Sequence, residues 1–171
     1  MEQDERAGLP GGGTAGECVA HESPVVRVMT IEDYDEVSAL WERIHGFALR
    51  SLDDSREYVA RFLVRNPFLS CVAVMGGRAV GSILCGHDGR QGSFYHVCVA
   101  PECRQHGIGK QMVRFCLQAL AAEGISKATL VAFGDNEVGN KFWSGIGWTA
   151  RRDFNSYEFA LNEENITRYV Q

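Results

Sequence analysis

Apolar residues recur along this chain with two periodicities, one typical of helices and one typical of strands. Where they return every three or four positions, as they do from Val37 to Ile44, the spacing predicts an amphipathic helix. Helices are expected on this basis over about 32–44, 53 or 54 to 65, 109–122 and 136–144. Continuous or alternating apolar runs predict strands over 25–29, 69–75, 79–86, 93–99 and 127–133, with two more after Trp148 around Asp153-Phe154-Asn155. The order β-α-α-β-β-β-α-β-α-β-β indicates an α/β fold with a mixed sheet and helices on both faces.

Turn and capping residues stand where these elements are expected to begin or end. Thr30 can cap the first helix, and Asn66-Pro67 ends the second. Gly76-Gly77 and Asp88-Gly89 supply hairpin turns between three consecutive strands. Gly124 closes the helix over 109–122. The local signals therefore agree with the periodicity.

The first 24 residues differ in composition from the rest of the chain. They include Gly11-Gly12-Gly13, and with five acidic residues and one arginine they carry −4 of the net charge of −5. Such a segment cannot bury enough apolar surface to offset the entropy lost on ordering. Residues 1–24 are therefore predicted to be a disordered tail, and residues 25–171 are predicted to form one domain.

Composition excludes several classes of protein. The net charge is negative and no block of five like charges occurs, so nucleic acid is not an expected partner. No apolar run approaches the ~18 residues that span a bilayer, so no membrane association is expected. The acidic start lacks the basic and apolar regions of a secretory signal. A cytoplasmic location is therefore expected.

Six cysteines are present, and none forms a C-x-x-C pair, so no metal site is predicted. Cys71, Cys85, Cys98 and Cys116 lie within apolar runs, where a free thiol behaves as a small core residue. Without a secretory signal, reduced thiols are the better interpretation.

The segment from Arg104 to Lys110, RQHGIGK, holds the chemistry that is easiest to recognise. It follows a strand and opens a helix, so its backbone N–H groups and the helix N-terminus can bind an anion such as a pyrophosphate. Gly107 and Gly109 allow close approach of the backbone. The segment matches neither a P-loop nor the three-glycine dinucleotide fingerprint. Taken alone, its G-x-G is equally compatible with a plain tight turn.

The stretch from Val97 to Gly109, VCVAPECRQHGIG, resembles the acetyl-coenzyme A binding motif of GNAT N-acetyltransferases, [Q/R]-x-x-G-x-[G/A]. Downstream, Asn136, Gly139, Phe142-Trp143 and Gly147-Trp148 follow the family pattern N-x-x-A-x-x-F-Y-x-x-x-G-F. The opening RVMTIEDYDEVSALWERI also resembles the family's first strand and helix. The resemblance covers about residues 25–160 and is closest to the small bacterial YpeA-like branch.

The resemblance implies a mixed, mostly antiparallel sheet of about seven strands, with acetyl-CoA bound as the acetyl donor and no metal. In this family the strand before the glycine motif splays from its neighbour and opens a slot for the cofactor. The residues that would contact the cofactor here are Val97, Val99, Arg104, Gln105, His106, Gly107, Ile108, Gly109, Lys110, Asn136 and Trp143. Trp41, Phe47 and Tyr58 fall where the family builds its acceptor pocket, although Trp41 fits a core position better.

Catalytic residues are harder to assign, because the chain departs from the family at two positions. Trp143 stands where relatives often place a tyrosine acid, and an indole N–H does not usefully give up its proton. Val131 stands where some relatives carry a glutamate base. Tyr95 is then the first candidate for the base, through water, and His96 the second, although either could be an ordinary core residue. Trp143 is kept as a third candidate.

Strand alternation predicts which of these side chains share a face. It places Ser93, Tyr95, Val97 and Val99 on one face of the strand over 93–99. It places Phe94, His96 and Cys98 on the other. Cys98 is not expected to be a nucleophile, because an apolar run raises the pKa of a thiol.

The sequence therefore predicts an N-acetyltransferase that moves an acetyl group from acetyl-CoA to a primary amine by direct attack in a ternary complex. The acceptor is either a small-molecule amine or an amine of a protein. A non-catalytic acyl-CoA-binding or sensor module of the same fold is the alternative, and an unrelated nucleotide-phosphate binding protein is a third interpretation. A homodimer through the final strands is also expected.

Overall fold

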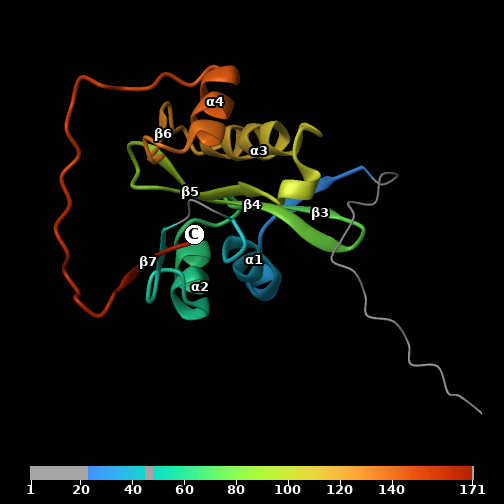
Figure 1. Ribbon diagram of the computed structural model, residues 1–171, viewed down its shortest axis with the longest axis horizontal. Helices are drawn as coiled ribbons and strands as arrows, with labels where there is room; N and C mark the ends of the chain where they lie inside the picture. The colour runs from blue at the N-terminus through green and yellow to red at the C-terminus, as the bar shows by residue number, and fades with distance from the viewer. Residues whose placement is uncertain (1–22, 45–47, 171) are drawn as a thin grey trace, which may run out of the picture.

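The computed structural model describes residues 23–44 and 48–170 of the chain. Its centre is a five-stranded sheet in the order β1-β3-β4-β5-β6, and β2 and β7 pair separately. Helices α1 and α2 lie on one face of the large sheet and α3 and α4 on the other (Figure 1). The strands are β1 Val25–Val28, β2 Ala48–Arg50, β3 Cys71–Met75, β4 Arg78–His87, β5 Gly92–Val99, β6 Ala128–Leu130 and β7 Thr167–Tyr169; the helices are α1 Tyr34–Trp41, α2 Arg56–Arg65, α3 Ile108–Ala122 and α4 Glu137–Gly145.

This arrangement confirms the predicted fold class, a mixed and mostly antiparallel sheet with helices on both faces. Only β5 and β6 are parallel, and the other four strand pairs are antiparallel. The seven strands match the expected number, although two of them form a sheet of their own. Residues 1–22, which make up most of the predicted tail, and Phe47 of the predicted acceptor pocket lie outside the described residues.

Side-chain caps mark the start of the first helical segments. The Thr30 N–H donates to Asp33 Oδ2 at 2.9 Å in a capping box at the start of the short 3₁₀ helix η1 (Ile31–Asp33), which leads directly into α1. Helix α2 begins later than predicted, at Arg56, because the Ser55 hydroxyl accepts from the Tyr58 N–H at 3.4 Å and acts as its N-cap. The carboxylate of Asp54, one of the two predicted helix starts, makes long-range contacts instead.

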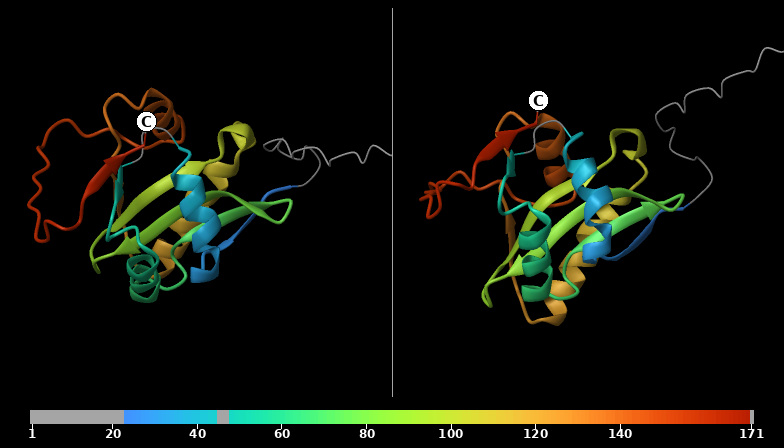
Figure 2. Two further views of the ribbon diagram at one scale, coloured as in Figure 1. Left: turned by 60° about the horizontal axis from the view of Figure 1, so that its bottom comes forward. Right: turned by 90° about the horizontal axis from the view of Figure 1, so that it is seen from below.

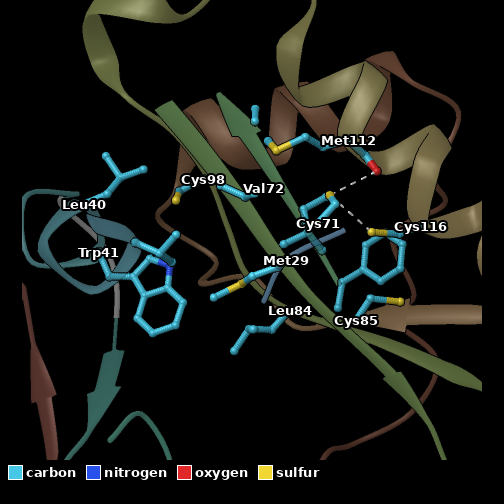
Figure 3. Packing of buried hydrophobic residues seen from close by; sticks show 14 of the residues in the cluster. Met29, Leu40, Trp41, Cys71, Val72, Leu84, Cys85, Cys98, Met112 and Cys116 are labelled. Atoms are coloured by element: carbon cyan, nitrogen blue, oxygen red, sulfur yellow. Dashed lines mark hydrogen bonds between the residues drawn. The ribbon is translucent and has the colours of Figure 1, made fainter. Parts of the chain in front are cut away.

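The core lies on both faces of the sheet. On the α3 face, Cys71 and Cys85 are fully buried together with Cys116, and the sulfurs of Cys71 and Cys116 are 3.6 Å apart (Figure 3). On the α1 face, Trp41 is 1% exposed and its indole N–H donates to Ser82 Oγ at 2.9 Å. The predicted core thiols and the core position of Trp41 are confirmed.

Strand β5 contains a bulge. Ser82 is opposite Cys98 and Leu84 is opposite Tyr95, so two residues of β5 face the single residue Ile83 of β4. His96, one of these two, has a φ of 47°, which is uncommon for a residue other than glycine. The extra residue reverses the alternation between the two halves of the strand.

The bulge overturns one prediction made from alternation. Tyr95 packs on Phe62 of α2, with ring centroids 5.9 Å apart. Val99 instead lies on the α3 face, where its Cγ2 is 3.7 Å from the position of a Cβ on Gly109. Tyr95 and Val99 therefore do not share a face, because period-2 counting fails across an extra residue.

Strands β5 and β6 pair over a short stretch. The register joins Gly92–Phe94 to Ala128–Leu130 and goes no further in the described residues. From Tyr95 to Val99 the edge of β5 that faces away from β4 therefore has no strand of the described residues beside it. A short pairing is what the divergence implied by the family resemblance would produce.

The end of the chain differs from the prediction. The two strands expected around Asp153-Phe154-Asn155 do not form, and the segment between Trp148 and Asn162 makes no strand pairing. The chain returns as β7, which pairs antiparallel with β2 (Figure 2). Two side-chain hydrogen bonds hold this returning segment in place. The Ser51 hydroxyl accepts from the Ile166 N–H, and Asn165 Oδ1 accepts from the Leu52 N–H. These contacts join residues more than a hundred positions apart, which a local pattern does not reveal.

Among the described residues, no helix has both the length and the apolar character needed to cross a membrane.

Replacing Gly81 by alanine should destabilise the sheet. A Cβ there would lie 2.8 Å from the Cys98 carbonyl oxygen and 2.9 Å from Met112 Cε. Overpacking of this kind costs about 1–3 kcal/mol. Urea unfolding should therefore show a lower free energy of unfolding for Gly81→Ala. Gly134→Ala, where nothing lies within 4 Å of the added Cβ, is the control and should behave as wild type. Equal stability of the two variants would contradict this packing.

Candidate active site

The glycine loop, residues 104–110, connects β5 to α3. Gly107 adopts a φ of 76° and is the N-cap of α3, and Gln105 has a φ of 66°. The first intrahelical bond is donated by the Gln111 N–H to the Gly107 carbonyl at 3.0 Å. The N–H groups of Ile108, Gly109 and Lys110 therefore have no intrahelical acceptor and are available to an anion.

Side chains of the glycine loop divide into exposed and buried groups. Arg104 and Lys110 are exposed and place two positive charges at the ends of the loop, and Gln105 and Gly107 are exposed as well. Ile108 is 1% exposed, so it can contribute to a ligand only through its backbone. The His106 ring is exposed to solvent, and its Nδ1 lies 3.3 Å from the Cys103 carbonyl oxygen. The loop thus offers backbone donors flanked by cations.

Gly109 is a glycine because α4 approaches closely. A Cβ at this position would lie 3.1 Å from Cζ of Phe142. Helix α4 therefore packs on the first turn of α3, beside the glycine loop. The two segments of the family resemblance, about thirty residues apart in sequence, are brought together by this contact.

The open edge of β5 leads from the bulge to the glycine loop. The Ala100 N–H donates to the Val80 carbonyl at 2.8 Å, so by alternation the backbone groups of Val99 point away from β4. The Val99 carbonyl accepts from Arg104 Nε at 3.1 Å. Val97 lies two residues earlier, at the bulge. Of the predicted residues, Val99 and Arg104 are therefore in contact, and Val97 precedes them on the same strand.

Asn136 and Trp143 belong to α4. Asn136 is its N-cap, and its Oδ1 accepts from the Gly139 N–H at 2.9 Å. Trp143 lies in a row of aromatic rings, 5.0 Å from Phe142 and 4.9 Å from Trp148, which in turn is 5.4 Å from Phe94 (centroid distances). The indole is thus a packing element on the α3 and α4 face of the sheet.

Tyr95 and His96 lie on the opposite face, toward α1 and α2. Tyr95 is 52% exposed, so it can reach solvent or a ligand. The His96 ring packs on Trp41 with centroids 4.6 Å apart, and its Nε2 lies 2.5 Å from Asp54 Oδ1. The structure therefore brings two of the three candidate catalytic residues together and leaves Trp143 on the other side of the sheet.

Asp54 is the functional candidate that sequence reasoning missed. It is 42 positions from His96 in the sequence. It also falls at a predicted helix start, where an aspartate is expected simply as a helix cap. No motif or periodicity links the two residues. Only the fold places the loop before α2 against the bulge of β5.

Cys98 is buried next to the bulge, with its sulfur 3.4 Å from Ser82 Oγ. Burial raises the pKa of the Cys98 thiol to about 11. The thiol is protonated at neutral pH, in agreement with the expectation that it is not a nucleophile.

Two further features do not coincide with these residues. A shallow hollow of about 430 Å³ lies on α4 between Glu137, Asn140 and Ser144, none of them a candidate site residue. In the described part of the chain, no group of three or more His, Cys, Asp and Glu side chains is arranged to hold a metal ion.

Comparison with known proteins agrees with this geometry. Residues 33–148 match the sequence model of the Acetyltransferase (GNAT) family. An acetyltransferase of Sodalis glossinidius is 37% identical over 113 residues, which cover 66% of this chain and 78% of that protein. An acetyltransferase of Photorhabdus laumondii is 36% identical over the same length and coverage. The chain belongs to the GNAT family and is an acyltransferase, as the resemblance predicted.

Solved structures show the same fold. The aminoglycoside N-acetyltransferase AAC(6')-Iy, in complex with CoA, superimposes with a TM-score of 0.67 at 16% identity, covering 82% of this chain and 97% of that one. Ard1 of Thermoplasma volcanium superimposes with a TM-score of 0.62, also at 16% identity, covering 72% of this chain and 81% of that one. At this level of identity the likeness concerns the fold alone.

Native Cys98 should resist alkylation. A thiol whose pKa is about 11 is almost entirely protonated at pH 8, and this one is also buried. Iodoacetamide at pH 8 should leave the Cys98 peptide unmodified by mass spectrometry until the protein is unfolded in urea. Rapid stoichiometric labelling of that peptide in the native protein would contradict the buried, neutral thiol.

Proposed function

We propose that the chain transfers an acetyl group from acetyl-CoA to a primary amine by direct attack in a ternary complex. The observation that carries this proposal is the continuity of the glycine loop with the unpaired edge of β5. The loop supplies backbone donors and two cations for a pyrophosphate. The edge supplies backbone hydrogen-bonding groups for an extended, amide-containing arm.

The cofactor residues follow from this arrangement. Arg104, Lys110 and the backbone of the glycine loop would hold the pyrophosphate of coenzyme A, with Gln105 and His106 at the rim. The backbone of Val97 and Val99 would bind the pantetheine arm. Asn136 and Trp143 would border the thioester end from α4. Acetyl-CoA itself supplies the reacting thioester, and no metal is needed.

The amine would approach from the α1 and α2 face, where Tyr95 and His96 lie. An ammonium acceptor must lose a proton before it can attack. The neutral nitrogen then forms a bond to the acetyl carbon, the C–S bond breaks, the nitrogen loses its second proton as the amide forms, and the thiolate of coenzyme A takes a proton from that nitrogen or from water. Tyr95, acting through water, and His96 are the candidate bases.

The acceptor is either a small-molecule amine or an amine of a protein, and the location is proposed to be cytoplasmic. Aminoglycoside N-acetyltransferases share the fold, which supports an amine acceptor in general and no particular one. We also propose that the protein forms a homodimer. The competing function, acyl-CoA binding without turnover, is favoured by Trp143, whose ring packs among other aromatic rings where a tyrosine acid is usual in the family.

Gly107→Glu should abolish acetyl-CoA binding in calorimetric titration. The carboxylate would enter the anion site and repel the pyrophosphate, and Gln111 Nε2, 4.0 Å from the added Cβ, leaves room for it. Gly124→Glu is a matched control, because Gly124 has a φ of 77° at the other end of α3 with nothing within 4 Å. Both variants bear the same cost of about 1–2 kcal/mol for a left-handed residue.

Micromolar binding by wild type and Gly124→Glu, with none by Gly107→Glu, would support the cofactor site. Equal binding by all three proteins would place the pyrophosphate elsewhere. If none binds, the proposed function is wrong.

Tyr95→Phe should lower kcat by roughly 10- to 100-fold if Tyr95 relays the proton, since general base catalysis typically contributes 10²–10⁴-fold. Binding of acetyl-CoA should be unchanged, because the ring lies away from the glycine loop. Tyr157→Phe, at a ring that is 89% exposed in the segment after Trp148, is the control, and its kcat should match that of wild type. Steady-state assays with a panel of primary amines would measure both. An unchanged kcat for Tyr95→Phe would remove Tyr95 from the mechanism.

A further inference from the structure

The Asp54 carboxylate joins two segments that are distant in sequence. Its Oδ2 accepts from the backbone N–H of Arg50 at 2.6 Å, and its Oδ1 lies 2.5 Å from His96 Nε2. The Asp54 carbonyl accepts from the Tyr34 hydroxyl at 2.7 Å. Only 13% of the side chain is exposed. Both carboxylate oxygens are therefore engaged, and the group cannot easily rotate.

The His96 ring is also fixed in place. Its backbone is held at the bulge with a φ of 47°, and its ring packs on Trp41 at an interplanar angle of 37°. Ser82 Oγ, which accepts from the Trp41 indole, lies 3.4 Å from the His96 carbonyl oxygen. The side chain of His96 is 14% exposed. Strain at a bulge and a preorganised imidazole are features that recur at active sites.

We propose that Asp54 is a positioning residue for acetyl transfer, fixing the tautomer and orientation of His96 so that His96 accepts the proton of the acceptor amine. This inference rests on the proposed function. A carboxylate next to Nε2 keeps the proton on that nitrogen, so Nδ1 becomes the nitrogen that can accept a second one. A buried carboxylate orients the imidazole of a catalytic triad in the same manner.

The proton balance follows from this geometry. The ammonium of the acceptor gives one proton to His96 Nδ1, and the imidazolium that forms donates from Nε2 to Asp54. The neutral amine then attacks the acetyl carbon, the C–S bond breaks, and the thiolate of coenzyme A takes the proton that the attacking nitrogen loses as the amide forms. The imidazolium returns its proton to bulk water after the product leaves.

Other titratable groups near the pair do not replace Asp54. Tyr34 lies on the η1–α1 side, where burial first and then Asp54 raise the pKa of its hydroxyl, so it stays neutral. Cys98, on β5 itself, is likewise neutral, with its pKa raised to about 11. On the loop before α2, Asp53 pairs with the Arg50 guanidinium at 3.3 Å. Among the described residues, Asp54 is the carboxylate that contacts His96.

The test compares Asp54→Asn with Asp53→Asn in the full-length protein. An asparagine can still accept from the Arg50 N–H, but its NH₂ donates to Nε2 and drives the His96 proton onto Nδ1. Asp54→Asn should lower kcat/KM for an amine on the order of 100-fold and move the acid limb of its pH profile to lower pH, because a neutral neighbour stabilises the imidazolium less. Asp53→Asn should match wild type, and all three should bind acetyl-CoA equally.

A double variant separates positioning from folding. Once His96→Asn has removed the imidazole, adding Asp54→Asn should lower kcat/KM no further, because residues that act as one unit are not additive. Nitrogen-15 NMR of the His96 ring gives a readout independent of turnover, with the proton on Nε2 in wild type and on Nδ1 in Asp54→Asn. These two results together would support the inference.

Different outcomes overturn different claims. If wild type acetylates amines and Asp54→Asn does so within threefold and with an unchanged pH profile, the role of Asp54 is wrong. The role of Asp54 is also wrong if NMR shows the same His96 tautomer in wild type and in Asp54→Asn. If wild type binds acetyl-CoA but acetylates no amine of a panel of polyamines, aminoglycosides and peptides, the proposed function itself is wrong.

Discussion

Strand β5 has one residue more than the stretch of β4 it pairs with, and the candidate active site depends on that bulge. Without this bulge, Tyr95 and Val99, which are four positions apart, would lie on the same face of the sheet. With it, Tyr95 and His96 both reach the α1 and α2 face, while Val99 stays beside the glycine loop. The bulge gives His96 a positive φ, which is energetically unfavourable for a residue other than glycine. The packing of its ring on Trp41 and its contact with Asp54 offset this unfavourable energy.

The two faces of the sheet consequently present different chemical groups. The α3 and α4 face presents backbone donors and positive charge, suited to a phosphate and a polar arm. The α1 and α2 face presents an exposed phenol and a fixed imidazole, suited to moving a proton. A thioester lying at the divergence of β5 and β6 would be accessible from both faces, which is what a direct transfer between two bound substrates requires.

Several long-range contacts hold the imidazole side together. The loop before α2 is bound by Asn165 and Ser51 to the returning C-terminal segment, and β7 pairs with β2. The Asp54 carboxylate extends this support to β5. The C-terminal segment thus supports, through the loop before α2, the position of one side chain near the middle of the chain.

The sequence by itself determined the helices, most strands, the hairpin turns, the core thiols and the glycine loop. These features depend on contacts between neighbours in sequence, or on one strongly constrained position such as the left-handed Gly107. The tertiary structure alone decided the face on which Tyr95 lies, the pairing of β7 with β2 instead of strands near Phe154, and the partner of His96. A bulge is invisible to period-2 counting, and contacts over 42 or more residues leave no local pattern, because they form only when the sheet brings those segments together.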